Sequence, residues 1–278
     1  MSGPVEIRPG QSLELLKELH ILTRDGKLNQ DSRRKLKQVY HLYQFIEPLL
    51  AEVMKERGTV RLVDHGAGKS YLGFILYDLF FKSLPGDSHI YGVEARDELV
   101  EKSRELAIRL GFPGMSFINR TVAEAATADE IPAAVDVVTA LHACDTATDD
   151  AIRFALQKKA QFIVLVPCCQ AEVAAALRRH KAGALAKGAL GELWRHPIHT
   201  REFGSHVTNV LRCLQLEAHG YRLNVTELVG WEHSLKNELI IARRGAQGNR
   251  QAAARLAEIL DLLGLTELQQ RFFIPDRL

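Results

Sequence analysis

The chain has 278 residues, 46% of them hydrophobic and 25% charged, with a formal net charge of +2. This is the composition of an ordinary globular protein that can bury a full core, and the near-neutral charge gives no overall electrostatic signal for nucleic acid. Its four cysteines, two of them adjacent, do not make a disulfide framework, and no apolar run is long enough to span a bilayer. Because the N-terminus also has no signal pattern, we expect a soluble, cytoplasmic protein.

The first part of the chain, residues 11–57, is predicted to be helical. It contains a basic segment, Ser32–Gln38, that we expect to be exposed. After this segment, apolar residues recur at helical spacing, at Val39, Leu42, Tyr43, Ile46 and Leu50. From Val60 onward strands and helices alternate, which is typical of a parallel sheet with helices on both faces.

The stretch VDHGAGKSYLG, residues 63–73, ends like a nucleotide-binding P-loop. A P-loop needs a glycine where this chain has Val63, and the dinucleotide pattern needs a third glycine where it has Tyr71. What remains is a strand, a loop with Gly66 and Gly68, and a helix from about Ser70. The glycines allow the backbone to approach a ligand closely, and the start of the helix favours a carboxylate or another anion.

The next strand is predicted to end at Glu94, 26 positions after Gly68. In nucleoside-binding α/β folds an acid at this place accepts hydrogen bonds from two ribose hydroxyls, for which paired carboxylate oxygens are well suited. The alternative is an ordinary solvated charge at a strand end. Spacing and context favour the ribose role.

The last two strands, YRLNVTELVG and ELIIARR, are separated by the seven residues WEHSLKN. A parallel crossover needs a dozen residues or more, so these strands are predicted to be antiparallel if they pair with each other. We expect a helical N-terminal extension (1–57), a sheet domain (58–245) and a C-terminal helical tail (246–278) that caps or docks.

Five motifs in order carry a resemblance to a known family: KLKQVYHLYQFIEPLL, VDHGAGKSYLGFIL, LHACDTATDDAI, PCCQ and GWEHSLKNELIIAR. Over about residues 33–244 the chain resembles the class I methyltransferases that include methyltransferase-like protein 25 and the glutathione-transferase-C-terminal-domain-containing protein. The tRNA ribose methyltransferases are more distant relatives. The resemblance implies a Rossmann-like sheet of seven strands and S-adenosyl-L-methionine (SAM) as cofactor.

The resemblance implies that Asp64, Gly66, Gly68 and Glu94 hold the cofactor. Their neighbours in the loops after the first four strands complete the expected cofactor site: His65, Ala67, Ala95, Val122, Leu141 and His142. We expect no metal there. The chain departs from the family in having Ala67 and Ser70 in the glycine loop and in lacking the zinc-finger segment of the tRNA enzymes.

Cysteines follow the fourth and fifth strands, where a methyl acceptor would lie. Three interpretations stay open: thiolates that add to a pyrimidine before methylation of its C5, zinc ligands together with a histidine, or small residues that line the acceptor pocket. The candidate catalytic residues are His142, Cys144, Asp145, Cys168, Cys169 and Lys236.

Basic and polar residues are the candidates for acceptor binding. The segment between the fifth and sixth strands is expected to overhang the acceptor pocket. Its histidines and arginines could orient an acceptor or touch phosphate, although each histidine singly fits a surface or capping role. The candidates are Lys35, Lys37, His196, His199, Arg201, His206, His233 and Asn237. The distant tRNA relatives suggest RNA or a ribonucleoprotein as acceptor; protein methylation and a non-catalytic RNA- or partner-binding module are the alternatives.

Overall fold

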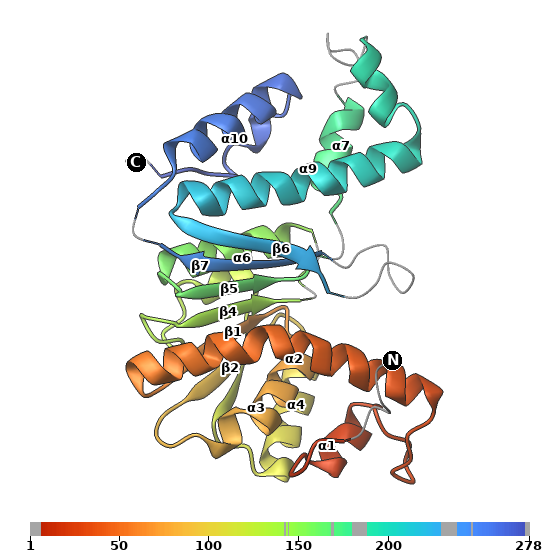
Figure 1. Cartoon of the computed structure of the whole chain (residues 1–278), viewed down its shortest axis with the longest axis vertical. Helices are drawn as coiled ribbons and strands as arrows, with labels where there is room; N and C mark the ends of the chain where they lie inside the picture. The colour runs from red at the N-terminus through yellow and green to blue at the C-terminus, as the bar shows by residue number, and fades with distance from the viewer. Residues whose placement is uncertain are drawn as a thin grey trace.

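The computed structural model describes residues 7–141, 143, 145–167, 170–179, 188–228, 238–245 and 247–275, without the side chains of Asp31 and Trp194. A sheet of seven strands in the order β3-β2-β1-β4-β5-β7-β6 forms its centre (Figure 1). The strands are β1 (Arg61–His65), β2 (His89–Glu94), β3 (Met115–Asn119), β4 (Val137–Ala140), β5 (Phe162–Leu165), β6 (Tyr221–Glu227) and β7 (Glu238–Arg244).

The first five strands are parallel, and β7 is antiparallel to both of its neighbours. The predicted fold, a mostly parallel sheet with a closing antiparallel hairpin, is therefore confirmed. Strand order reverses between β1 and β4, the two strands that flank the switch point of the sheet. Ligands bind beyond the carboxyl ends of the strands at such a point.

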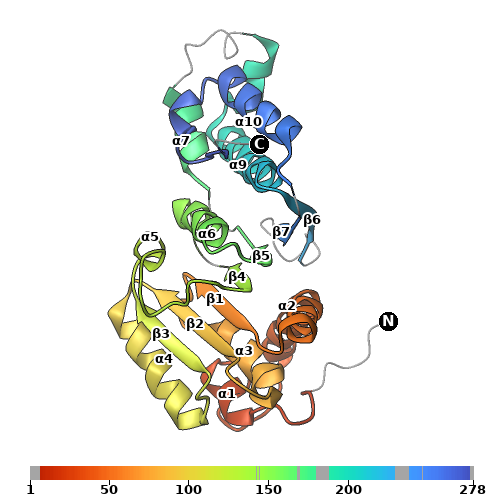
Figure 2. The ribbon, with the colours of Figure 1, turned by 90° about the vertical axis from the view of Figure 1, so that its left-hand side faces the viewer.

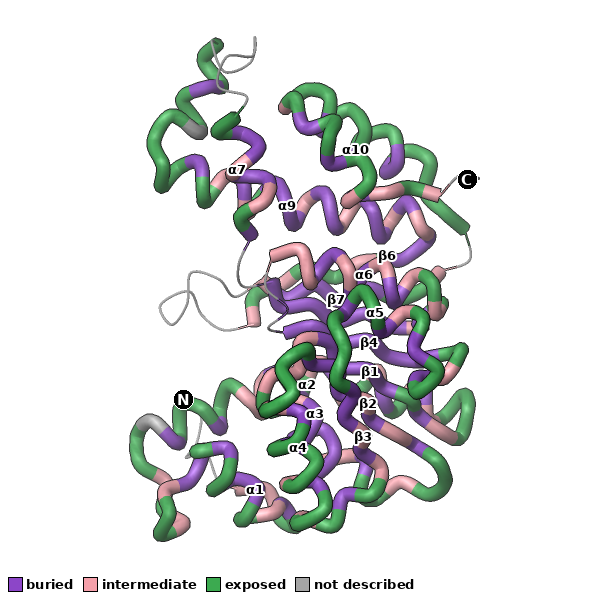
Figure 3. The backbone as a smooth tube through the Cα atoms, turned by 180° about the vertical axis from the view of Figure 1, so that it is seen from behind, coloured by how far each residue is buried: buried purple, intermediate pink, exposed green. Residues whose placement is uncertain are grey.

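Helices cover both faces of the sheet (Figure 2). One core cluster packs the first four helices against one face, and a second packs α5, α6 and the end of α9 against the other. The helices are α1 (Leu13–Glu18), α2 (Gln30–Arg57), α3 (Tyr71–Leu79), α4 (Asp97–Leu110), α5 (Val122–Ala125), α6 (Thr146–Gln157), α7 (Glu172–Arg179), α9 (Pro197–Ala218) and α10 (Arg250–Leu262). The strands are largely buried between these layers (Figure 3).

The N-terminal region is two helices and not one continuous helical stretch. Gly26 has a positive φ of 76° in the connection, and the side chain of Asn29 accepts a hydrogen bond from the Ser32 amide at 2.8 Å, which caps α2. At the other end of α2, Arg57 pairs with Asp136, just before β4. The helix therefore begins on the side of the molecule where the parallel strands end (Figure 1).

The C-terminal tail packs as a helix, as the sequence predicted. Its apolar residues Leu256 and Leu260 join a third core cluster with Val173 of α7 and Leu211 of α9. The helices α7 and α9 approach closely, because a Cβ atom at Gly204 would lie 2.7 Å from Ala174. Only glycine permits this backbone contact.

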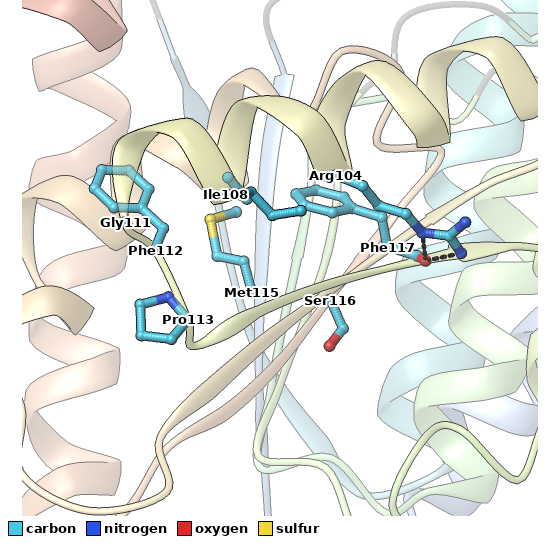
Figure 4. A pocket seen from close by; sticks show the side chains of 9 residues that line it. Arg104, Ile108, Gly111, Phe112, Pro113, Met115, Ser116 and Phe117 are labelled. Atoms are coloured by element: carbon cyan, nitrogen blue, oxygen red, sulfur yellow. Dashed lines mark hydrogen bonds between the residues drawn. The ribbon is translucent and has the colours of Figure 1, made fainter.

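The edge strand β3 is protected by a side chain from α4. The guanidinium of Arg104 donates two hydrogen bonds to the Phe117 carbonyl, at 3.2 and 2.7 Å (Figure 4). Nearby, Ile108 is 81% exposed beside a hollow between α4 and β3. A charged side chain bound to an edge carbonyl discourages pairing with another strand.

Within the described residues, no helix has both the length and the apolar character needed to cross a lipid bilayer.

Candidate functional site

The loop after β1 is built on two glycines with left-handed backbone. Gly66 and Gly68 have φ values of 63° and 59°, which residues with a side chain rarely adopt. A Cβ atom at Gly66 would lie 3.1 Å from Cα of Ala143, so this loop touches the loop after β4. At Gly68, by contrast, an added Cβ would meet nothing closer than Arg96 Nη2 at 3.8 Å. The backbone at Gly68 is therefore open to a ligand.

The carboxylate of Glu94, at the end of β2, lies against this loop. One oxygen, Oε2, accepts a hydrogen bond from the Gly68 amide at 2.8 Å, and Oε1 accepts from the amide and Nε of Arg96, at 3.0 and 2.8 Å. Burial raises the pKa of Glu94, but the hydrogen bonds from Arg96 and Gly68 outweigh it and hold the pKa below its usual value. Glu94 is therefore a charged acceptor at the place where the sequence predicted a ribose contact.

Asp64 and His65, at the end of β1, point to opposite faces of the sheet. Asp64 accepts a hydrogen bond from the Thr139 hydroxyl at 2.6 Å, and burial raises its pKa to about 7. The His65 ring packs edge-on against Phe154, with a centroid distance of 4.4 Å, and burial lowers its pKa to about 3. Neither ring nitrogen has a hydrogen-bond partner among the described residues. His65 is thus a neutral core residue behind the loop.

The remaining cofactor candidates surround the same end of the sheet. Val122, in α5, and Leu141, after β4, are buried, whereas Ala95 is exposed and accepts a hydrogen bond from Asn119. The amide of Ala67 donates to the Val93 carbonyl at 3.0 Å, which ties the glycine loop to β2. Of the expected cofactor residues, His142 lies outside the described residues.

Asp145 connects the loop after β4 with the loop after β5. Its Oδ1 accepts hydrogen bonds from the amides of Ala171 and Glu172, at 2.9 and 3.3 Å, and so caps the start of α7. Asp145 itself has φ 50° and ψ −121°, a conformation that side chains disfavour. The carboxylate of this candidate catalytic residue is therefore occupied with holding two loops together.

A buried arginine, Arg212 of α9, completes this connection. Its guanidinium binds both carboxylate oxygens of Asp149, at 2.7 and 2.8 Å, and also donates to the Asp145 carbonyl at 2.8 Å and to Asn209 at 3.3 Å. Asn209 in turn accepts from Gln170 and donates to Glu238. One polar network thus links the segments that follow β4 and β5 with the start of β7.

Several sequence candidates lie outside the described residues: His142, Cys144, Cys168, Cys169, His233, Lys236 and Asn237. Their roles stay predictions. Described neighbours of all three segments, namely Asp145, Gln170 and Glu238, belong to the polar network around Arg212. These three described residues, which flank the motifs in sequence, are therefore joined at one end of the sheet.

The basic candidates lie on two sides of this end. His199, Arg201 and His206 are exposed on α9, and the rings of His196 and His199 pack edge to face, with centroids 5.3 Å apart. On α2, Lys35 and Lys37 are exposed, as expected. Both helices begin on the side of the molecule where β6 ends (Figure 1).

A family of methyltransferase domains matches residues 34–176, that is, 143 of the 278 residues. The chain belongs to this methyltransferase domain family. S-adenosyl-L-methionine is its cofactor, and the residues present fit it. The open backbone at Gly68 permits close approach, and Glu94, which is held in the structure by Gly68 and by the exposed side chain of Arg96, is a charged acceptor for a ribose. The narrower likeness to methyltransferase-like protein 25 stays a prediction.

Solved structures similar to this chain are methyltransferases of several kinds. An rRNA methylase from Streptococcus thermophilus is 11% identical, with 72% of this chain and 93% of the other covered and a TM-score of 0.44. Magnesium protoporphyrin IX methyltransferase from Synechocystis, with bound SAH, is 13% identical (84% and 93% covered, TM-score 0.45). An SAH-bound methyltransferase from Podospora anserina is 11% identical (88% and 91% covered, TM-score 0.48). No curated protein sequence is significantly similar to this chain.

Proposed function

We propose that this methyltransferase transfers a methyl group from SAM to RNA. The observation that carries the proposal is the contact between Gly66 and Ala143, because it brings the cofactor loop against the loop that holds the acceptor candidates. When bound, SAM supplies an electrophilic methyl group on its sulfonium. A nucleophilic atom of the acceptor forms the new bond to carbon, and the electron pair of the broken bond stays on sulfur.

In this proposal the described residues bind the cofactor and fix the positions of the loops around the acceptor. Glu94 and Gly68 hold the ribose end of the cofactor. Asp145 keeps the loops after β4 and β5 in register, since its carboxylate bonds to the amides of Ala171 and Glu172. Proton transfer at the acceptor is assigned to the candidates in the adjoining segments, His142 and Lys236.

Exposed basic side chains support RNA as the acceptor. Lys35 and Lys37 lie on one side of the carboxyl end of the sheet, and His199, Arg201 and His206 lie on the other. Phosphate groups are contacted mainly by such side chains, and contacts on both sides of a reaction site fix the position of a nucleic acid. The cytoplasm is the location that we propose along with this substrate.

The proposal is tested with SAM that carries a labelled methyl group. Purified full-length protein is incubated with total RNA or with total protein from cells that lack the gene, and label in each fraction is counted. We expect label in RNA, and roughly 5–50-fold less of it when a Glu94→Gln variant is used at SAM concentrations near the wild-type Kd. Label in the protein fraction alone would show that the acceptor is a protein, and tight binding of ATP or NAD in place of SAM would contradict the cofactor role of the site.

A further inference from the structure

A groove of about 590 Å³ lies between α7 and α9. On one side it is lined by Ala171, just before α7, and by Ala174 and Arg178, which lie four residues apart on one face of α7. On α9 it is lined by the first turns of the helix, including Ile198 and Arg201. The groove therefore has a floor of small apolar residues and an arginine on each side.

The crossing of the two helices fixes this groove. Gly204 of α9 lies against Ala174 of α7 so closely that a Cβ atom would reach within 2.7 Å of the alanine backbone. Arg201 and Arg178 are three and four residues from this contact along their helices. Because this contact is between the two helix backbones, it fixes the distance between the backbone positions of the two arginines.

Arg178 and Arg201 form no buried ion pair with any of the described residues. Arg178 has no ion-pair partner among the described residues, whereas its neighbour Arg179 pairs with Glu267. Arg201 pairs with Glu202, the next residue, and both side chains are at least half exposed. Exposed pairs of this kind contribute little and are screened by salt, so both arginines are available to an anion.

The groove leads to the acceptor loops. Gln170, which lines one end of it, donates to Asn209 at 3.0 Å and accepts from Ser205 at 2.7 Å. Through Asn209 it belongs to the network of Arg212 and Asp145. An extended ligand bound in the groove would therefore lie beside Gln170, in the segment that follows β5.

We propose that this groove binds the sugar–phosphate backbone of the RNA acceptor, with Arg178 and Arg201 as phosphate contacts; the proposal rests on RNA methylation as the function of the protein. Guanidinium groups bind phosphate through two parallel hydrogen bonds, which suits them to this role better than a single ammonium. The apolar floor contacts sugar carbons and leaves base edges free to reach the acceptor site. Arg178 was not among the residues that the sequence indicated for substrate binding.

The test is the salt dependence of binding to a fluorescein-labelled single-stranded RNA of mixed sequence. The full-length protein is compared with Arg178→Gln/Arg201→Gln and with a matched control, Arg222→Gln, which removes an exposed arginine from β6 outside the groove. We expect the double variant to bind about tenfold more weakly, with a log–log salt slope flatter by about 0.7 for each phosphate that is no longer bound. The control should match the wild type.

A second variant, Ile198→Glu, places a negative charge at a side chain that is 58% exposed, so the fold can accept it. It should weaken RNA binding at least as much as the double variant does, and the SAM affinity measured by calorimetry should not change.

Wild-type affinity and slope in both groove variants would overturn the proposal while leaving RNA methylation intact. Equal competition by a polyglutamate peptide of matched charge would also overturn it, because the groove would then bind anions without regard to RNA. Methyl transfer to protein alone would instead contradict the proposed function itself.

Discussion

Arg212 and Asp149 form a bidentate ion pair inside the protein, with nitrogen–oxygen distances of 2.7 and 2.8 Å. The two side chains are 0% and 3% exposed. Charges so far from water are stable only while each has its partner, since a lone buried charge has lost its hydration without compensation. The pair also holds the loop after β4, because Arg212 donates to the Asp145 carbonyl.

Replacing Arg212 by methionine should therefore lower the free energy of unfolding by about 3–5 kcal/mol, measured by urea denaturation. The double variant Arg212→Met/Asp149→Leu should recover part of this loss, because it leaves no unpaired charge. As a control, Arg201→Gln breaks an exposed pair and should change stability by no more than about 0.5 kcal/mol. Equal effects of Arg212→Met and Arg201→Gln would show that the buried pair does not stabilise the fold.

Asp64 and His65 should make opposite contributions to the pH dependence of stability. The pKa of Asp64 is about 7 in the folded protein and near 3.8 when unfolded, so its contribution is fully present below pH 3.8 and is lost as pH rises to 7. The pKa of His65 is about 3 when folded and near 6.5 when unfolded, so its contribution is present above pH 6.5 and is lost as pH falls to 3. Between about pH 4 and 6.5 the two slopes cancel.

Single variants separate the two contributions. In His65→Leu, stability relative to the wild type should fall by about 1 kcal/mol per pH unit as pH rises from 4 to 6.5, because only Asp64 remains. In Asp64→Asn, stability relative to the wild type should instead fall by about 1 kcal/mol per pH unit as pH decreases from 6.5 to 4, because only His65 remains. Urea denaturation of all three proteins at half-unit steps of pH measures this, without SAM. Curves that run parallel to the wild type would contradict the buried ionisations.

Glu94→Gln should weaken SAM binding by about 1.5–3 kcal/mol, which corresponds to roughly 10–100-fold in Kd. The amide keeps the size of the side chain but loses the charge and one acceptor oxygen, so it cannot accept from Gly68 and from two ribose hydroxyls at once. Calorimetry with SAM and with its demethylated product measures the change. Glu105→Gln, at an exposed position of α4, is the matched control and should bind as the wild type does. Unchanged affinity in Glu94→Gln would remove the ribose role.

The order of the elements and the position of Glu94 could be predicted because both depend on local patterns. Strand and helix periodicities identify βα units, and the short WEHSLKN connection excluded a parallel crossover between the last two strands. The break before α2 was missed, because helical propensity on each side hides a connection set by Gly26 and the cap at Asn29.

Arg212 could not be assigned from the sequence, because its partner Asp149 is 63 positions away and an arginine is normally a surface residue. The one available signal was its place on the face of α9 that also carries Leu211 and Leu216, both buried. Asp145 was expected to be catalytic from its motif. Its contacts with the amides at the start of α7 depend on strand order, which brings β4 and β5 together only in the folded sheet.

The cysteines after β4 and β5 are predicted to line the acceptor pocket without covalent catalysis. Serine at Cys144, Cys168 or Cys169 should then leave methyl transfer to RNA within about a hundredfold of the wild type, because a hydroxyl replaces the thiol in size but not in nucleophilicity. Gel analysis with a 5-fluoropyrimidine RNA should reveal no covalent complex. A trapped complex that disappears in one serine variant would establish the thiolate mechanism of C5 methylation instead.

The basic start of α2 is predicted to contact RNA from the side opposite the α7–α9 groove. Lys35 and Lys37 are exposed, and the helix begins where the parallel strands end (Figure 1). Changing both to alanine should weaken RNA binding. It should also flatten the log–log salt dependence by about one unit of slope for each phosphate contact that is lost. Lys55→Ala is the control, since this exposed lysine lies near the other end of the same helix. Lys236→Ala, by contrast, should reduce turnover more than binding, because the sequence predicts that Lys236 acts at the acceptor and not in phosphate contact. If the Lys35/Lys37 variant keeps the wild-type salt slope and affinity, α2 does not contact RNA, and the basic residues of α9 together with Arg178 must account for all phosphate binding.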